Sequence, residues 1–168
     1  MAKDAELLRR TSLLDGLSAD AVSLLLASGR FVRFKAGETV MREGEESDTM
    51  YLFLEGDVDV TKNLTLKISG KGFGHAEKSM TRLRAGSAPV FGEMSMFGDE
   101  PRSATVSAAS DCVLFEVTRR SFEAICERDP RLGLELTRRI AVMLASRVRK
   151  GNDDVLKLST ALSIALSR

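Results

Sequence analysis

The sequence has a single histidine, His75, and only two cysteines, Cys112 and Cys126. Metal enzymes on all-β folds need several histidine ligands, and neither cysteine has a partner at metal-ligand spacing, so metal catalysis is disfavoured. One histidine also leaves no nucleophile–base pair with an orienting third group. Both cysteines stand among apolar residues, as reduced core thiols do. The residue types therefore favour a protein that is not an enzyme and holds no metal.

An excess of one charge and long apolar runs are also missing. The chain has 25 basic and 24 acidic residues, a net charge of +1, which creates no general attraction to nucleic acid or a membrane surface. Residues 22–27 form only a short apolar run, and the first ten residues lack the apolar core of a secretory signal. With 168 residues, 43% of them hydrophobic, we expect one globular, cytoplasmic protein with a sizeable core.

The order of predicted elements is helix, then strands, then helices. Ser18 is a helix cap for residues 18–27. Short apolar stretches separated by glycine turns then follow at a spacing of about ten residues, which is typical of a sandwich or barrel. Residues 69–87, rich in glycine and basic side chains, are predicted to form an exposed loop or loose hairpin tip. The predicted strands are 31–34, 39–41, 50–54, 58–60, 64–68, 104–108 and 112–117.

Helical periodicity returns at residues 121–127, and Asp129 with Pro130 predicts the start of the next helix. That helix is expected to bury a face that includes Leu136 and to end at Gly151, with a last helix from residue 153. We therefore divide the chain into a β-rich unit, residues 1–130, and a C-terminal helical segment, residues 131–168.

The stretch 91–106, FGEMSMFGDEPRSATV, carries the chemistry of a binding site. Gly92 lets the backbone approach a ligand closely, and the first N–H groups of a short helical turn after it attract an anion. Arg102 offers a planar fork that matches two phosphate oxygens. Glu93 suits a hydroxyl donor such as ribose. The pattern favours a nucleotide whose phosphate lies next to its sugar; the alternative is an internal salt bridge between Glu93 and Arg102.

Two segments, FKAGETVMREGEESDTMYLFLEGDVDV and FGEMSMFGDEPRSATVSAASDCVLFEV, together resemble the cyclic-nucleotide-binding domain family. This family is shared by protein kinase regulatory subunits, cyclic-nucleotide-gated channels and catabolite-activator-type regulators. The resemblance spans roughly residues 12–149 and includes the glycines at which the family turns. It implies a mainly β fold with flanking helices: an eight-stranded β-roll of jelly-roll type between N-terminal and C-terminal helices.

The resemblance also implies roles for individual residues. Glu93 would bond the ribose 2′-hydroxyl, and Arg102 would pair with the cyclic phosphate. Arg147 lies where relatives contact the base, and would stack on the purine as a cation–π cap, unless it is a solvated arginine. The phosphate cradle would be completed by Gly92, Met94, Ser103 and Ala104. The apolar wall beside the base would include Val90 and Phe91, for which core packing is the alternative.

We therefore expect a cytoplasmic sensor of cAMP or cGMP, without cofactor, that relays binding through movement of the helices after Asp129. Its partner would be another protein, or a second copy bound through the C-terminal helices. Direct DNA binding is not expected, because only one helix is predicted after Gly151 and a helix-turn-helix needs more. The alternatives are a scaffold on the same fold that binds no ligand, and a fragment of a channel or transcription regulator.

Overall fold

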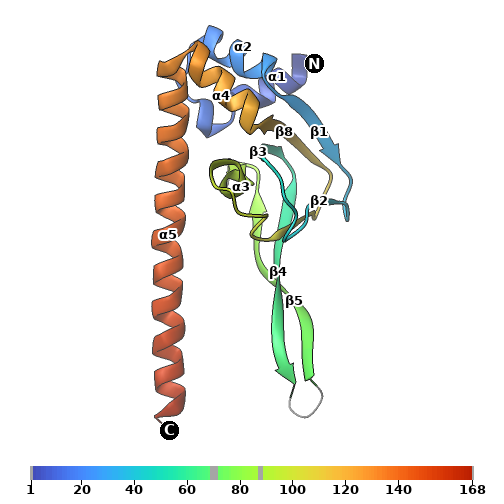
Figure 1. Ribbon diagram of the computed structural model, residues 1–168, viewed down its shortest axis with the longest axis vertical. Coiled ribbons are helices and arrows are strands. Elements are labelled where there is room, and N and C mark those ends of the chain that lie inside the picture. The colour runs from blue at the N-terminus through green and yellow to red at the C-terminus, as the bar shows by residue number, and fades with distance from the viewer. Residues whose placement is uncertain (1, 69–71, 87–88, 168) are drawn as a thin grey trace.

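The computed structural model describes residues 2–68, 72–86 and 89–167. The described part contains eight strands, which confirms the predicted β-roll with helices at both ends (Figure 1). The strands are β1 Arg30–Phe34, β2 Thr39–Met41, β3 Thr49–Glu55, β4 Asp57–Ile68, β5 Gly72–Arg84, β6 Val90–Phe91, β7 Thr105–Ala108 and β8 Cys112–Thr118. The helices are α1 Ala2–Arg9, η1 Ser12–Leu14, α2 Ala19–Ala27, α3 Glu93–Phe97, α4 Arg119–Arg128 and α5 Pro130–Leu166.

The strands form two antiparallel four-stranded sheets, in the orders β1-β8-β3-β6 and β2-β7-β4-β5. One group of buried side chains, including Phe53, Val58 and Leu114, fills the roll. A second group lies on the helical side, where Leu25 and Ile125 pack with Phe115. Within the described ranges, no helix combines the length and apolar character needed to cross a bilayer.

The predicted loop at residues 69–87 is wrong over most of its length. β5 pairs with β4 along the whole strand, from Asp57 opposite Arg84 to Ile68 opposite Gly72. The two strands form a ribbon that extends away from the N-terminal helices (Figure 1). Residues 69–71 and 87–88 lie outside the described residues. Pairing with a neighbouring strand supplies the backbone hydrogen bonds that the glycines of this segment alone do not predict.

The predicted helix starts at Ser18 and Asp129 are confirmed. The Ser18 hydroxyl accepts from the Ala21 N–H at 3.2 Å, and the Asp129 carboxylate accepts from the Leu132 N–H at 3.0 Å. The predicted break at Gly151 is wrong, because α5 is one helix of 37 residues that runs through this glycine. In Figure 1, α5 runs as a single rod along one side of the roll.

The first turns of α5 are firmly packed. Leu132, Leu136 and Ile140 are buried in the helical-side core. A Cβ atom on Gly133 would lie 2.8 Å from Cα of Cys126, so α4 and α5 meet with no room for a side chain. Val148, which the helical spacing places on the same face as Leu136, is 61% exposed. Beyond its first turns α5 leaves the core.

Candidate functional site

A cavity of about 120 Å³ opens between the start of α3, the chain after Arg102, and α5. It brings together eight of the nine predicted site residues: Phe91, Gly92, Glu93, Met94, Arg102, Ser103, Ala104 and Arg147. Four apolar side chains that the sequence did not single out complete the wall: Met41, Val60, Leu83 and Val106. The motif at 91–106 thus folds into one concave surface, and Arg147 reaches it from α5.

Val90 is the exception. Its side chain is fully buried in the helical-side core and does not line the cavity, so its assignment to the apolar wall is corrected. Neighbouring residues of a strand point to opposite faces, and Phe91 therefore faces the interior of the roll while Val90 faces away. Val90 still borders the site through its carbonyl group, which accepts a hydrogen bond from Arg147.

Gly92 carries the chain from β6 into α3 in the left-handed conformation, with φ of 80°. A Cβ atom there would lie 2.7 Å from Nη1 of Arg102 and 3.1 Å from the Thr49 carbonyl oxygen. Only glycine fits both the backbone angle and the close approach of the guanidinium.

Replacing Gly92 with alanine is therefore expected to lower the free energy of unfolding by about 1–3 kcal/mol, from backbone strain and displacement of Arg102. Urea denaturation of the two proteins measures the difference. The matched control is Gly86→Ala, where φ is also positive, 91°, but no heavy atom lies within 4 Å of the added Cβ. Equal losses in both variants would contradict a specific contact with Arg102.

Arg102 is 4% exposed and is held by neutral groups from two stretches of the chain, residues 47–49 and 92–95. Nη1 donates to the carbonyl oxygens of Thr49 and Gly92, at 2.6 and 2.9 Å, and to the Ser95 hydroxyl at 2.7 Å. Nη2 donates to the hydroxyls of Ser47 and Thr49, at 2.9 and 2.6 Å. Nε is buried and has no hydrogen-bond partner among the described residues. The guanidinium is thus fixed in place, and its Nε–H group is the one without an acceptor among the described residues.

Burial lowers the pKa of Arg102, and the surrounding Tyr51, Glu45, Asp48 and Glu93 oppose the shift. Arginine stays charged in proteins because its ordinary pKa lies far above neutral pH. Among the described residues, no carboxylate accepts a hydrogen bond from Arg102. A buried positive charge without an ion-pair partner favours an anionic ligand, because burial without compensation is costly.

Glu93 does not pair with Arg102, so the internal salt bridge weighed from the sequence is absent. Its carboxylate is buried, 3% exposed, and Oε1 accepts from Nη1 of Arg147 at 2.8 Å. The predicted sugar-binding group and the predicted base-capping group are thus bonded to each other. Arg147 is not a solvated arginine; it links α5 to α3.

The sequence missed Ser47, Thr49 and Ser95, the hydroxyl residues that hold Arg102. Ser47 precedes β3, Thr49 is the first residue of β3, and Ser95 lies within α3; no local pattern marks them. Arg147 had a detectable signal, because it continues the spacing of the buried Leu136 and Ile140 along one helix face.

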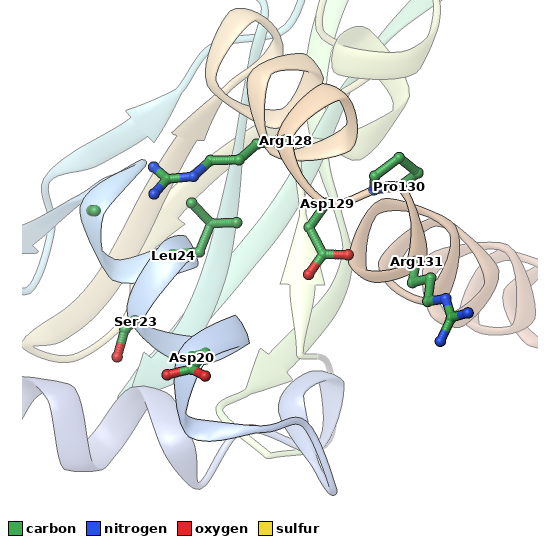
Figure 2. Close-up of a pocket in the computed structure, with 8 residues that line it drawn as sticks. Asp20, Ser23, Leu24, Arg128, Asp129, Pro130 and Arg131 are labelled. Carbon is green, nitrogen blue, oxygen red and sulfur yellow. The ribbon is translucent and has the colours of Figure 1, made fainter.

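A wider cavity, of about 680 Å³, lies between α2 and the junction of α4 with α5 (Figure 2). Arg128 and Arg131 line it, and Figure 2 shows their guanidinium groups pointing away from each other. Both side chains are exposed, and Asp129 is already engaged as a helix cap. Because its polar groups do not converge, we assign the function to the smaller cavity. The described residues hold no group of three His, Cys, Asp or Glu side chains fit for a metal ion.

Comparisons with known proteins identify relatives of this domain. The family model of the cyclic nucleotide-binding domain matches residues 31–129. The CRP-like cAMP-activated global transcriptional regulator of Mycobacterium tuberculosis is 26% identical over 153 residues, which are 91% of this chain but only 62% of that protein. The chain therefore spans less than two thirds of the length of this relative.

Solved structures show the same architecture. A cyclic nucleotide-binding domain from Methylobacillus flagellatus KT matches with a TM-score of 0.73 and 25% identity, covering 92% of this chain and 82% of that one. The regulatory domain of Toxoplasma gondii PKA, crystallised with cAMP, matches with a TM-score of 0.63 and 25% identity, covering 83% and 49%. Because the family model spans more than half of the sequence, this chain belongs to the cyclic nucleotide-binding domain family.

Proposed function

We propose that this chain is a non-enzymatic sensor that binds a cyclic nucleotide, cAMP or cGMP, in the cavity between α3, Arg102 and α5. The observation that carries the proposal is the environment of Arg102. Its guanidinium is buried and lines the cavity; within the part of the chain that the structure describes, it has no carboxylate partner and its Nε–H has no acceptor. A singly charged phosphodiester supplies the missing acceptor and the missing negative charge.

The other groups around the cavity suit the rest of such a ligand. Glu93, an acceptor when ionised, bonds a ribose hydroxyl. The Ser103 hydroxyl and the backbone of Gly92, Met94 and Ala104 complete the phosphate cradle. Phe91, with the apolar residues of the roll, forms one wall for the base. The ligand of the Toxoplasma gondii domain, cAMP, supports this class of ligand.

In our proposal α5 carries the output. Leu136 and Ile140 are 2% and 1% exposed and belong to the core of this chain, so this face of α5 is not available to a second copy. Further along α5 an exposed apolar stripe is available instead: Val148, Val155, Leu158, Leu162 and Leu166. In our proposal a protein partner or a second copy binds this stripe. Binding takes place in the cytoplasm and involves no direct contact with DNA.

A thermal-shift panel with cAMP, cGMP and cyclic dinucleotides tests the binding step. A ligand present at 100 times its Kd stabilises the folded state by about 2.7 kcal/mol, which for a chain of this size raises the melting temperature by roughly 5–10 °C. We expect this shift with at least one cyclic mononucleotide and a much smaller one with the linear 5′-monophosphate as control. A flat panel would instead favour a ligand-free interaction scaffold.

A further inference from the structure

Arg119, the first residue of α4, contacts two other parts of the chain. Its backbone N–H donates to the carbonyl oxygen of Asp48 at 2.8 Å. Its side-chain Nη2 donates to the carbonyl oxygens of Ser95 and Gly98, at 3.0 and 2.5 Å, within and just after α3. Figure 1 shows α3 below the start of α4. One arginine therefore connects the chain around Asp48 and the end of α3 to the same end of α4.

The contacts of the Arg119 guanidinium are mainly with backbone. The last carbonyl groups of a helix have no partner within it and favour a nearby cation, so Arg119 supplies α3 with both a donor and a charge. Nη1 also pairs with Asp99 at 3.0 Å, but the Asp99 side chain is 97% exposed, and such an ion pair contributes little. We therefore attribute the role of Arg119 to its bonds with α3.

The groups that Arg119 holds are next to the groups that hold Arg102. The Ser95 hydroxyl accepts from Nη1 of Arg102, and the Ser95 carbonyl oxygen accepts from Arg119. Ser47 and Thr49, which bond Nη2 of Arg102, lie on either side of the residue that bonds the Arg119 N–H. Arg119 does not itself line the cavity. Its contacts reach the cavity only through the residues that surround Arg102.

We propose that Arg119 is a positioning residue of the binding site. It fixes α3 and residues 47–49, and so places the guanidinium of Arg102 without touching the ligand. A binding group that is already held in place loses less freedom when the ligand binds, and affinity is higher for that reason. This inference rests on the proposed function, in which Arg102 binds the phosphate.

Calorimetric titration with cAMP and cGMP measures the effect on affinity. We expect Arg119→Ala to bind about tenfold more weakly than the unsubstituted protein, because the charged hydrogen bonds that hold α3 are lost. Arg119→Lys keeps the charge but has a single nitrogen to donate from. Its loss should be smaller, about threefold, and this variant carries the test if the alanine variant does not fold.

Two controls separate positioning from other effects. Asp99→Asn removes the exposed ion pair and leaves the bonds between Arg119 and α3. Arg139→Ala removes an arginine that likewise bonds a backbone carbonyl oxygen, that of Leu13, and an acidic side chain, Glu135, but does not line the cavity. Both controls should bind as the unsubstituted protein does. Unchanged binding by Arg119→Ala, or an equal loss in either control, would overturn the proposal.

NMR of the Arg102 Nε–H group tests the positioning without a ligand. This group is buried and has no acceptor among the described residues, so its exchange with water reports how firmly the guanidinium is held. Exchange should be faster in ligand-free Arg119→Ala than in ligand-free Arg139→Ala, and equal rates would overturn the proposal. If no protein binds a cyclic nucleotide, the proposed function fails, while this exchange still decides whether Arg119 positions Arg102.

Discussion

Replacing Arg102 with alanine is expected to weaken cyclic-nucleotide binding by roughly 30- to 1,000-fold, about 2–4 kcal/mol. In our proposal the guanidinium is the main partner of the phosphate, and charged hydrogen bonds are the strongest polar contacts available to it. Isothermal calorimetry gives the affinity directly. An unchanged Kd would remove Arg102 from the site.

Arg102→Ala also removes the donor that bonds the Ser95 hydroxyl, a buried acceptor. Some loss of stability is therefore expected as well. Arg102→Lys separates the two effects, because lysine keeps the charge and loses the planar fork. If the fork matters, this variant will fold and still bind weakly. Circular dichroism before each titration confirms that the comparison is made between folded proteins.

The second large effect is expected at Glu93. In our proposal its carboxylate distinguishes ribose from 2′-deoxyribose, since a hydrogen bond to a charged group contributes more than one to a neutral amide. The ratio of Kd values for the 2′-deoxy and ribose forms of the same cyclic nucleotide should be roughly 10 to 150 in the unsubstituted protein, and below about 10 in Glu93→Gln.

This ratio is a better measure than either affinity alone. Glu93→Gln also weakens the ion pair with Arg147, so both ligands are affected by any release of α5. That shared effect cancels when the two affinities are divided. The same ratio in both proteins would argue against a contact between Glu93 and the ribose.

The binding motif was predictable because its determinants are local. Gly92 and Gly98 bound a five-residue helix, as the sequence indicated, and Arg102 follows closely enough to line the same cavity. The glycine-separated strands were predictable for a similar reason, since each turn is set by the residues within it. The sequence did not indicate which hydrogen-bond or ion-pair partner each side chain of the site has.

The errors concern features that depend on distant residues. β5 is a strand because β4 pairs with it, and its own glycines indicate a loop. The link from Arg147 to Glu93 spans the roll and the long helix, so no window of neighbouring residues contains it.

The helix across Gly151 is a different case, because the local signals there, glycine followed by asparagine and aspartate, do favour a break. The helix nevertheless continues through Gly151. An exposed glycine within a helix costs only about 1 kcal/mol relative to alanine, so a single glycine does not by itself end a long helix.

The length of α5 has a mechanical consequence. Its first turns pack closely against α4 at Gly133, so a tilt of the helix would be centred near its N-terminal end. At 1.5 Å of rise per residue, Leu166 lies about twice as far from Pro130 along the axis as Arg147 does. Such a tilt would move the tip about twice as far as the middle. A small displacement near Arg147 would therefore become a larger displacement at Leu166.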